Sequence, residues 1–480
     1  MTPVTQEETV HIRLWRPWRL LALAAIYVVI AHVLPRPEGV SPQGWRVAAV
    51  FAATISGFLL RPVPSAVVVL TALTALVVMG GVPMARALGG YGSPTVWLVG
   101  IAMLMSRPVK DTGLARRIAL LFVRRFGGTS LGVAYSLTFS DIILAAGIPS
   151  ITARSGGIML PIARGIAHLY ESKPGATADL LGKFLMLSLY QSSAVACAMF
   201  ITGQASNVLV GRLAQQQTGT AVTASSWFLS ALAPGLACAF LIPWLVHRIT
   251  RPQITKTPSA SEYARKELIA MGPVRGAEAI TLAVFSTVAL LWLTTAWHGL
   301  DVTLVALGGL AALLLSGVYA WRDALQENGA WDTFVWYGGI FTLGELLNET
   351  GVPKALAASV GANLSNIPWF AALVLTMALF YYMHYGFASV SAELLALFIP
   401  FLAMLVALGV PSRVAIYGLA CMPNLSAGLT HYSTTIGPIV LAENYVTLKL
   451  WWRVGIYASF VNLAVWLTIG PAWWKLLGYW

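Results

Sequence analysis

The sequence predicts an all-α polytopic membrane protein whose two halves repeat one plan. Three observations predict this class: 58% of the 480 residues are hydrophobic and 10% are charged, the apolar residues form long continuous stretches, and short motifs recur at a common shift. Soluble domains carry about 25% charged residues, so water cannot be the main solvent of this chain. We therefore expect lipid to surround most of it.

The apolar stretches give the expected transmembrane helices. A helix needs about 20 apolar residues to cross a bilayer, and by this criterion we expect about eleven spans. They lie near residues 20–34, 45–60, 65–82, 94–106, 178–201, 226–246, 277–297, 302–320, 334–347, 412–424 and 452–474. Two further apolar blocks, residues 130–170 and 367–409, are too long for one span each.

The net charge of +12 reflects the topology of the chain. Basic residues gather before the first span, after the fourth span and in the loop 249–274, whereas the alternate loops hold few. Cytoplasmic loops of membrane proteins carry such an excess of lysine and arginine. We expect a multi-pass protein of a bacterial inner membrane, with a cytoplasmic amino terminus and a periplasmic carboxyl terminus. Anionic lipid headgroups are the expected neighbours of these charges, and nucleic acid is not an expected partner.

Internal repeats divide the chain into two halves. The pattern Val-Trp-x-x-Gly-Ile occurs at residues 96–101 and again at 335–340, a shift of 239, and residues 150–152 face 389–391 at the same shift. The first half begins by crossing inward and the second by crossing outward, so the copies are related by inversion, as in many secondary transporters. Chance likeness between apolar stretches is the alternative. The expected divisions are the amino-terminal segment and first helix (1–44), a first repeat (45–248), a cytoplasmic linker (249–274) and a second repeat (275–480).

A short interfacial helix is expected after the fourth span. Residues 112–126 place their apolar side chains on one face and several arginines elsewhere, which is typical of a helix lying in the membrane surface. The counterpart of this helix in the second repeat, residues 352–363, is expected on the outer side.

Polar residues interrupt four apolar segments, two in each half. Non-helical backbone at membrane depth is tolerated only where it faces protein or water. We therefore expect the blocks 130–170 and 367–409 to be re-entrant hairpins whose tips meet near the membrane centre, each followed by a broken span. Backbone N–H groups and hydroxyls at such tips suit a carboxylate, although close helix packing is the alternative for any single residue. The interruptions lie at residues 150–152, 202–207, 389–391 and 423–438.

Ten residues in or beside these segments form the predicted substrate site. Hydrogen bonds from hydroxyl and amide groups can replace the water around a dianion, each contributing about 1.5–3 kcal/mol. Arg154 either binds a substrate carboxylate or pairs with Asp141, and His431 either contacts substrate or satisfies a backbone carbonyl. The ten residues are Ser150, Ile151, Thr152, Arg154, Asn207, Ser389, Val390, Ser391, Thr430 and His431.

These segments carry a resemblance to a known family. Residues 147–162 resemble the first signature of the divalent anion:sodium symporter (DASS) family. Three other segments resemble sequences of one branch of this family, which holds plastid 2-oxoglutarate/malate translocators and bacterial citrate or tartrate/succinate antiporters. These segments are residues 384–389, 428–432 and 473–475. The likeness runs along essentially the whole chain. It implies a homodimeric elevator carrier, in which a static scaffold supports a mobile transport domain that holds the hairpins.

The chain departs from this family pattern at three positions. Ile151 stands where the family's tips carry asparagine, Ser391 where the second tip usually has threonine, and Glu393 where the branch commonly has histidine. An isoleucine side chain cannot coordinate sodium or donate to a carboxylate. The sodium site that the resemblance implies therefore lacks one of its ligands in this chain.

We expect a secondary transporter of small di- or tricarboxylates, of the succinate, malate, 2-oxoglutarate and citrate class, that works by sodium-independent exchange. The alternative is sodium-coupled symport, with the ion near Ser150, Asn207 and Ser389. A membrane-embedded enzyme is less favoured, because the seven histidines lack the spacing of a metalloprotease motif. A channel is less favoured, because the paired hairpins argue for a carrier. No cofactor is expected.

Overall fold

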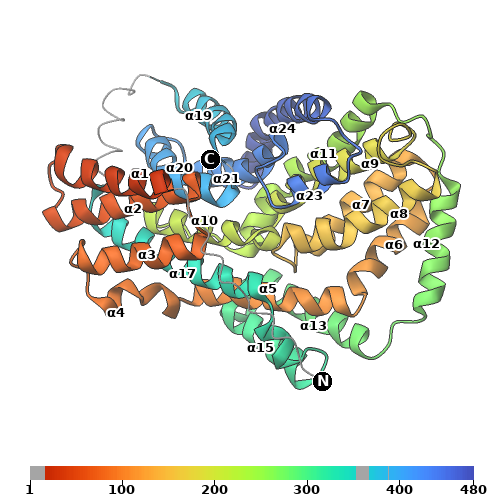
Figure 1. Ribbon diagram of the computed structural model, residues 1–480, viewed down its shortest axis with the longest axis horizontal. Helices are drawn as coiled ribbons and strands as arrows, with labels where there is room; N and C mark the ends of the chain where they lie inside the picture. The colour runs from red at the N-terminus through yellow and green to blue at the C-terminus, as the bar shows by residue number, and fades with distance from the viewer. Residues whose placement is uncertain (1–16, 353–366, 388) are drawn as a thin grey trace, which may run out of the picture.

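The fold is a bundle of α-helices in the computed structural model, which describes residues 17–352, 367–387 and 389–480 (Figure 1). Within those ranges the β pairing is limited to one antiparallel bridge, between Thr129 and Lys256. The all-α class is therefore confirmed. The helices of the first half are α1 (Pro17–Val28), α2 (Pro42–Leu60), α3 (Ser65–Val78), α4 (Met84–Ala87), α5 (Pro94–Asp111), α6 (Leu114–Phe126), α7 (Ser130–Ala145), α8 (Leu160–Leu169), α9 (Gly182–Met199), α10 (Ala205–Thr218) and α11 (Ala224–Thr250). Those that follow are α12 (Pro258–Met271), α13 (Ala277–Leu293), α14 (Thr295–His298), α15 (Val302–Leu315), α16 (Trp321–Leu325), α17 (Asn328–Glu349), α19 (Trp369–Met383), α20 (Val390–Ala407), α21 (Ser412–Ala420), α22 (Met422–Ser426), α23 (Ile436–Ala442) and α24 (Leu448–Leu476).

Four helices in the described part of the chain are long and apolar enough to cross a membrane, namely α2, α11, α20 and α24. Shorter apolar helices include α3, α7, α13 and α15. The expectation of about eleven spans is thus not matched helix for helix, because some expected spans are broken. The span expected at 412–424 divides into α21 and α22 at Cys421. Pro423 has no backbone N–H to continue the preceding helix, which accounts for this division.

Each of the two long apolar blocks forms a helix–turn–helix hairpin. In the first, α7 is followed by non-helical residues 146–150 and then by a π-helix, η3 (Thr152–Met159), that runs into α8. In the second, α19 is followed by a 3-10 turn, η5 (His384–Gly386), and by α20, which begins after an extended Ser389 with φ −160° and ψ 130°. Pro149 cannot donate a helical hydrogen bond, so it favours the first break. That both hairpins re-enter the membrane stays a prediction.

The two halves interlock around these turns. Helices α7 and α19 begin at the same shift as the sequence repeat. The limb after the first turn, η3, contacts α23, while the limb after the second turn, α20, contacts α10. Because α10 and α23 follow the polar breaks of the first and second half, each hairpin packs against the broken span of the opposite half. Inverted repeats place a transport site between such elements, and the three boundaries between the four predicted divisions stay predictions.

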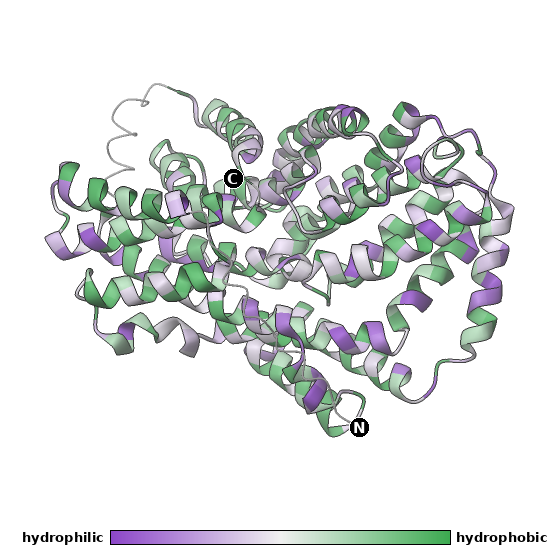
Figure 2. Ribbon diagram, in the orientation of Figure 1, coloured by the Kyte–Doolittle hydropathy of each residue, from purple (hydrophilic) through white to green (hydrophobic). Residues whose placement is uncertain are grey.

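The expected linker 249–274 contains a helix rather than irregular chain alone. Helix α12 packs along α6, the helix found at the predicted interfacial segment, and crosses the right side of the molecule in Figure 1. Figure 2 shows several hydrophilic residues on α12, in contrast to the largely hydrophobic α3. Arg117 of α6 is buried and pairs with Glu278 of α13 through two contacts of 2.5 and 2.9 Å. Nearly all of the expected second interfacial helix, 352–363, lies outside the described residues.

Candidate functional site

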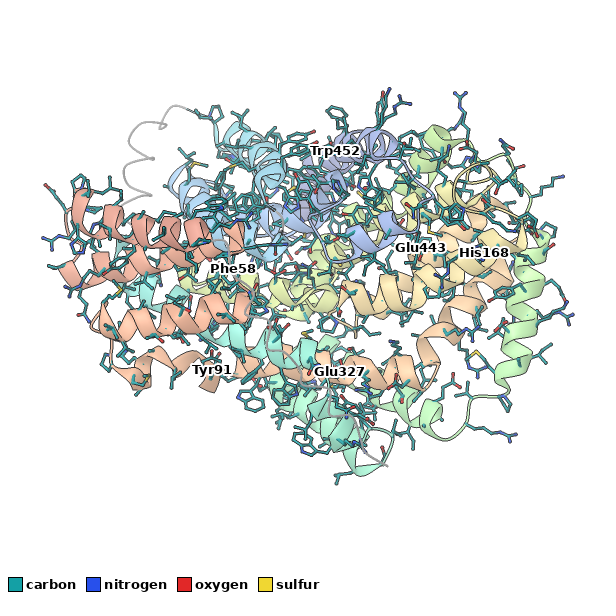
Figure 3. The ribbon with its side chains drawn as sticks, in the orientation of Figure 1. Phe58, Tyr91, His168, Glu327, Glu443 and Trp452 are labelled. Atoms are coloured by element: carbon teal, nitrogen blue, oxygen red, sulfur yellow. The ribbon has the colours of Figure 1, made fainter. Side chains whose placement is uncertain are left out.

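A cavity of about 730 Å³ lies where the two halves meet. Ligand pockets typically have volumes of about 300–1,000 Å³. The walls come from α5, the first hairpin turn with η3, the start of α10, α17, α20 and the residue that precedes α23. Figure 3 labels one wall residue, Glu327, in the lower part of the view. The polar residues of the wall are Ser106, Lys110, Ser150, Thr152, Gln204, Ser206, Glu327, Asp332, Thr333, Ser391 and Thr435.

The structure brings Ser150, Ile151, Thr152 and Ser391 together in this cavity, so four of the ten predicted residues share one space. The Thr152 hydroxyl is in hydrogen-bond contact with that of Thr435, which joins the first hairpin to the second half. The Ser150 hydroxyl accepts from the backbone N–H of Ala153 at 3.2 Å, which orients it at the start of η3.

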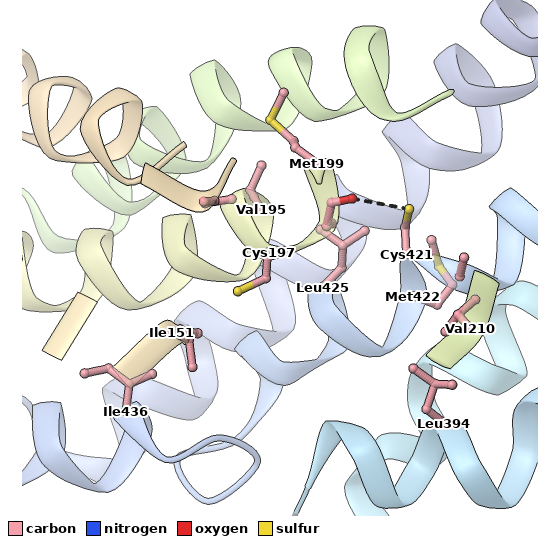
Figure 4. Close-up of a cluster of buried hydrophobic side chains, with 14 of the residues drawn as sticks. Ile151, Val195, Cys197, Met199, Val210, Leu394, Cys421, Met422, Leu425 and Ile436 are labelled. Atoms are coloured by element: carbon pink, nitrogen blue, oxygen red, sulfur yellow. Dashed lines mark hydrogen bonds between the residues drawn. The ribbon is translucent and has the colours of Figure 1, made fainter. Parts of the chain in front are cut away.

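Ile151 places an apolar side chain among these hydroxyls. It is 9% exposed and belongs to the buried apolar cluster. Figure 4 shows Ile151 and Ile436 as neighbours, in keeping with the contact between η3 and α23. Ile151 therefore offers a hydrocarbon surface to the cavity, and its side chain has no oxygen for a cation or a hydrogen bond.

Asn207 lies behind the cavity wall and is fully buried. Its amide nitrogen donates to the carbonyls of Cys197 and Phe200 at 2.8 and 2.9 Å. Its side-chain oxygen accepts from the amide of Asn424 at 2.8 Å, so the two broken spans are bonded to each other. The neighbouring Ser206 lines the cavity instead, and its hydroxyl has no partner among the described residues.

Arg154 is fully buried behind the first turn and does not line the cavity. Its guanidinium pairs with Asp141 at 2.9 Å and also donates to the carbonyls of Ile148 and Gly203, the latter at 2.8 Å. A fourth contact, of 3.2 Å, reaches the sulfur of Cys197. Of the two alternatives for Arg154, pairing with Asp141 is the one that this structure contains. The arginine fastens the first hairpin turn to the first broken span.

The other predicted residues of the second half do not line the cavity. Thr430 is fully buried, and its hydroxyl contacts that of Ser433. The His431 ring packs edge-on against Tyr432, with centroids 5.2 Å apart. Val390 is buried at the start of α20, and Ser389 caps this helix without a side-chain hydrogen bond.

Glu393, which departs from the family pattern, is also fully buried. Its carboxylate lies 2.5 Å from Nδ1 of His384, which is equally buried. The pair ties the first turn of α20 to the turn before it. Neither side chain lines the cavity.

Sequence reasoning missed several wall residues for which a signal existed. Thr435 lies in the polar interruption 423–438, in which the predicted site residues are Thr430 and His431. Ser206 lies next to the predicted Asn207. Lys110 belongs to the basic residues after the fourth expected span, which indicate the topology, yet it lines the cavity. Lys110 forms no ion pair within the described ranges, whereas Glu327 contacts Arg107 at 3.2 Å.

Comparisons with known proteins show the family of this chain. The family described as "Sodium:sulfate symporter transmembrane region" matches residues 14–480. "Putative malate transporter YflS" of Bacillus subtilis is 38% identical over 462 residues, which cover 96% of each chain. "Dicarboxylate transporter 1, chloroplastic" of Arabidopsis thaliana is 37% identical over 475 residues, covering 97% of this chain and 85% of that protein.

A solved structure supports the fold. The YdaH transporter of Alcanivorax borkumensis superimposes with a TM-score of 0.59 at 14% identity, covering 96% of this chain and 97% of the other. At that identity the likeness concerns the fold alone. The family match and the sequence relatives together go further: the chain is a membrane transporter rather than an enzyme, and it belongs to the divalent anion:sodium symporter family.

Proposed function

We propose that this protein exchanges small dicarboxylates of the succinate, malate and 2-oxoglutarate class across a bacterial inner membrane by alternating access. One observation carries the proposal: hydroxyls from both hairpins, Ser150, Thr152 and Ser391, line one cavity together with Lys110. Uncharged donors at a broken helix suit a carboxylate that must also be released. The names of the two relatives, one a malate and one a dicarboxylate transporter, support this substrate class.

Two side chains argue for exchange without sodium. Ile151 supplies no side-chain oxygen, and the side-chain oxygen of Asn207 already accepts a hydrogen bond from Asn424. Counter-transport of one dianion for another moves no net charge, so it needs no coupling cation. Symport with sodium is the second candidate. One observation favours it: the side-chain oxygen of Asn424 is buried and accepts no hydrogen bond from the described residues.

The expected architecture completes the proposal. The hairpins, α9 and the broken spans form the mobile part, and α1–α4 belong to the static scaffold of a homodimer. Basic residues gather at the Lys110 end of α5, which supports an orientation in which the cavity opens to the cytoplasm. The amino terminus then lies on the cytoplasmic side and the carboxyl terminus outside. The groove between α1, α2 and α3 is lined almost wholly by apolar side chains, in keeping with a lipid or subunit contact.

Uptake of radiolabelled succinate or 2-oxoglutarate into proteoliposomes tests the proposal. Exchange requires unlabelled dicarboxylate inside the vesicles and proceeds equally with or without sodium. Uptake into empty vesicles that depends on a sodium gradient would support symport instead. No uptake of any dicarboxylate under either condition would refute the proposed substrate class.

A further inference from the structure

A second cavity, of about 340 Å³, lies at the opposite end of α5 from Lys110. The first residues of α5, including Thr95, line this second cavity, whereas Met103, Ser106 and Lys110 further along the same helix line the first. Helix α5 has 18 residues, and at 1.5 Å per residue it is about 27 Å long. The two cavities therefore face opposite ends of the same helix.

A thin partition separates the two cavities. In α10, Ser206 of the first turn lines the first cavity, and Arg212 and Gln215 further along line the second. Thr202, in the break before α10, also lines the second cavity, and its hydroxyl donates to the carbonyl of Ala146 in the first hairpin turn at 2.9 Å. The first hairpin turn and the first break thus lie between the two cavities.

Arg212 gives the second cavity a positive charge that is offset only by Glu345, which interacts with it from beyond ion-pair distance. In the part of the chain that the structure describes, no carboxylate lies within ion-pair distance of Arg212, and its buried Nε has no hydrogen-bond partner. The guanidinium lies 5.9 Å from the centre of the Phe341 ring. An arginine whose planar donors are free is suited to bidentate binding of a carboxylate.

Hydroxyls and one acid complete the surroundings of Arg212. Thr95 supplies a neutral donor, whereas the Thr202 hydroxyl donates to Ala146 and the Thr223 hydroxyl caps α11. Asp301 lines the same cavity, but one of its oxygens accepts from the backbone N–H groups of Thr303 and Leu304 at 2.8 and 3.1 Å, as the cap of α15. The cap holds this negative charge in place, where it opposes an anion and so keeps binding weak enough for release.

We propose that the second cavity is an outer anion site, in which Arg212 binds one carboxylate of the substrate on the face where α5 begins, before the substrate reaches the hairpin turns. Asp301 limits the affinity of this site. The proposal deepens the proposed function and rests on it. It adds a charged residue that the ten predicted site residues do not include.

Half-saturation by succinate, measured separately from the two faces of sealed vesicles, tests this site. Each measurement keeps succinate saturating on the other side. From the face where α5 begins, we expect Arg212→Gln to raise the half-saturation concentration about tenfold, which corresponds to about 1.4 kcal/mol. From the opposite face, we expect it to rise less than twofold. Asp301→Asn should act in the opposite direction, lowering that concentration on the same face, because asparagine caps a helix about as well as aspartate does. The matched control is Arg86→Gln, whose arginine precedes α5 near the same face and pairs with the exposed Glu349.

The outcomes separate the two proposals. If the unaltered protein exchanges succinate but Arg212→Gln and Asp301→Asn leave the half-saturation unchanged, or change it equally from both faces, the outer site is refuted and the proposed function stands. If Arg212→Gln does not fold, the shift in Asp301→Asn alone decides. Absence of succinate exchange by the unaltered protein would overturn both proposals.

Discussion

The buried pair of Arg154 and Asp141 gives the sharpest test of what holds the first hairpin turn. We consider Asp141→Asn, which removes one negative charge and keeps the size of the side chain. Arg154 is fully buried, and its contacts reach Asp141, two backbone carbonyls and the sulfur of Cys197. Losing one partner leaves a buried charge without its counter-ion, which typically destabilises a protein by about 3–5 kcal/mol.

The assay is thermal unfolding of the purified protein in detergent, with succinate exchange measured in parallel. We expect Asp141→Asn to unfold at a clearly lower temperature than the unaltered protein. The matched control is Glu349→Gln, since Glu349 pairs at 2.6 Å with Arg86 and the two side chains are 56% and 55% exposed. Pairs of this exposed kind contribute up to about 1 kcal/mol, so the control should unfold close to the unaltered protein.

A direct role of Arg154 in substrate binding predicts the opposite pattern. Releasing Arg154 from Asp141 would then leave the unfolding temperature unchanged and tighten succinate binding. That result would refute the structural role assigned to the arginine. It would also move Arg154 from the support of the hairpin turn to the wall of the site.

Three further substitutions probe the cavity and its support. Thr435→Val removes the hydroxyl that contacts Thr152, a loss of about 0.5–1.5 kcal/mol, so we expect half-saturation by succinate to rise about two- to tenfold; an unchanged value would place Thr435 outside the site. Ile151→Asn adds a side-chain oxygen, and we expect altered selectivity with some gain of sodium dependence in uptake, whereas unchanged uptake would mean that this side chain points away from the substrate. Tyr190→Phe removes the hydroxyl that bonds the carbonyls of the second break at 2.8 and 2.7 Å, so we expect a loss of about 1–3 kcal/mol in stability, seen as a lower unfolding temperature; an unaltered temperature would argue against this support.

The hairpins could be predicted from sequence because their signals are local. Pro149 and the neighbouring small and polar residues interrupt an apolar run, and Ser389 to Ser391 repeat this pattern at a fixed shift. Breaks of this kind follow from the missing N–H of proline and from backbone that needs partners at membrane depth. The structure accordingly has a turn at each place.

The roles of single polar residues could not be predicted in the same way, because their partners lie far along the chain. The side-chain oxygen of Asn207 accepts a hydrogen bond from Asn424. The guanidinium of Arg154 donates to the sulfur of Cys197 and to the carbonyl of Gly203. No local pattern distinguishes an amide that bonds substrate from one that joins two helices. Thr435, by contrast, lies within a predicted polar interruption. The sequence did not indicate which of the many hydroxyls in that segment would line the cavity.

The central claim is that hydroxyls from the two halves share one carboxylate site, and protection from chemical labelling tests it most directly. The three native cysteines are buried, so Ser150→Cys and Ser391→Cys should provide the reactive thiols for a maleimide reagent. We predict that succinate slows the labelling of both variants with the same concentration dependence. Protection of one position alone, or of neither, would contradict a shared site between the two hairpins.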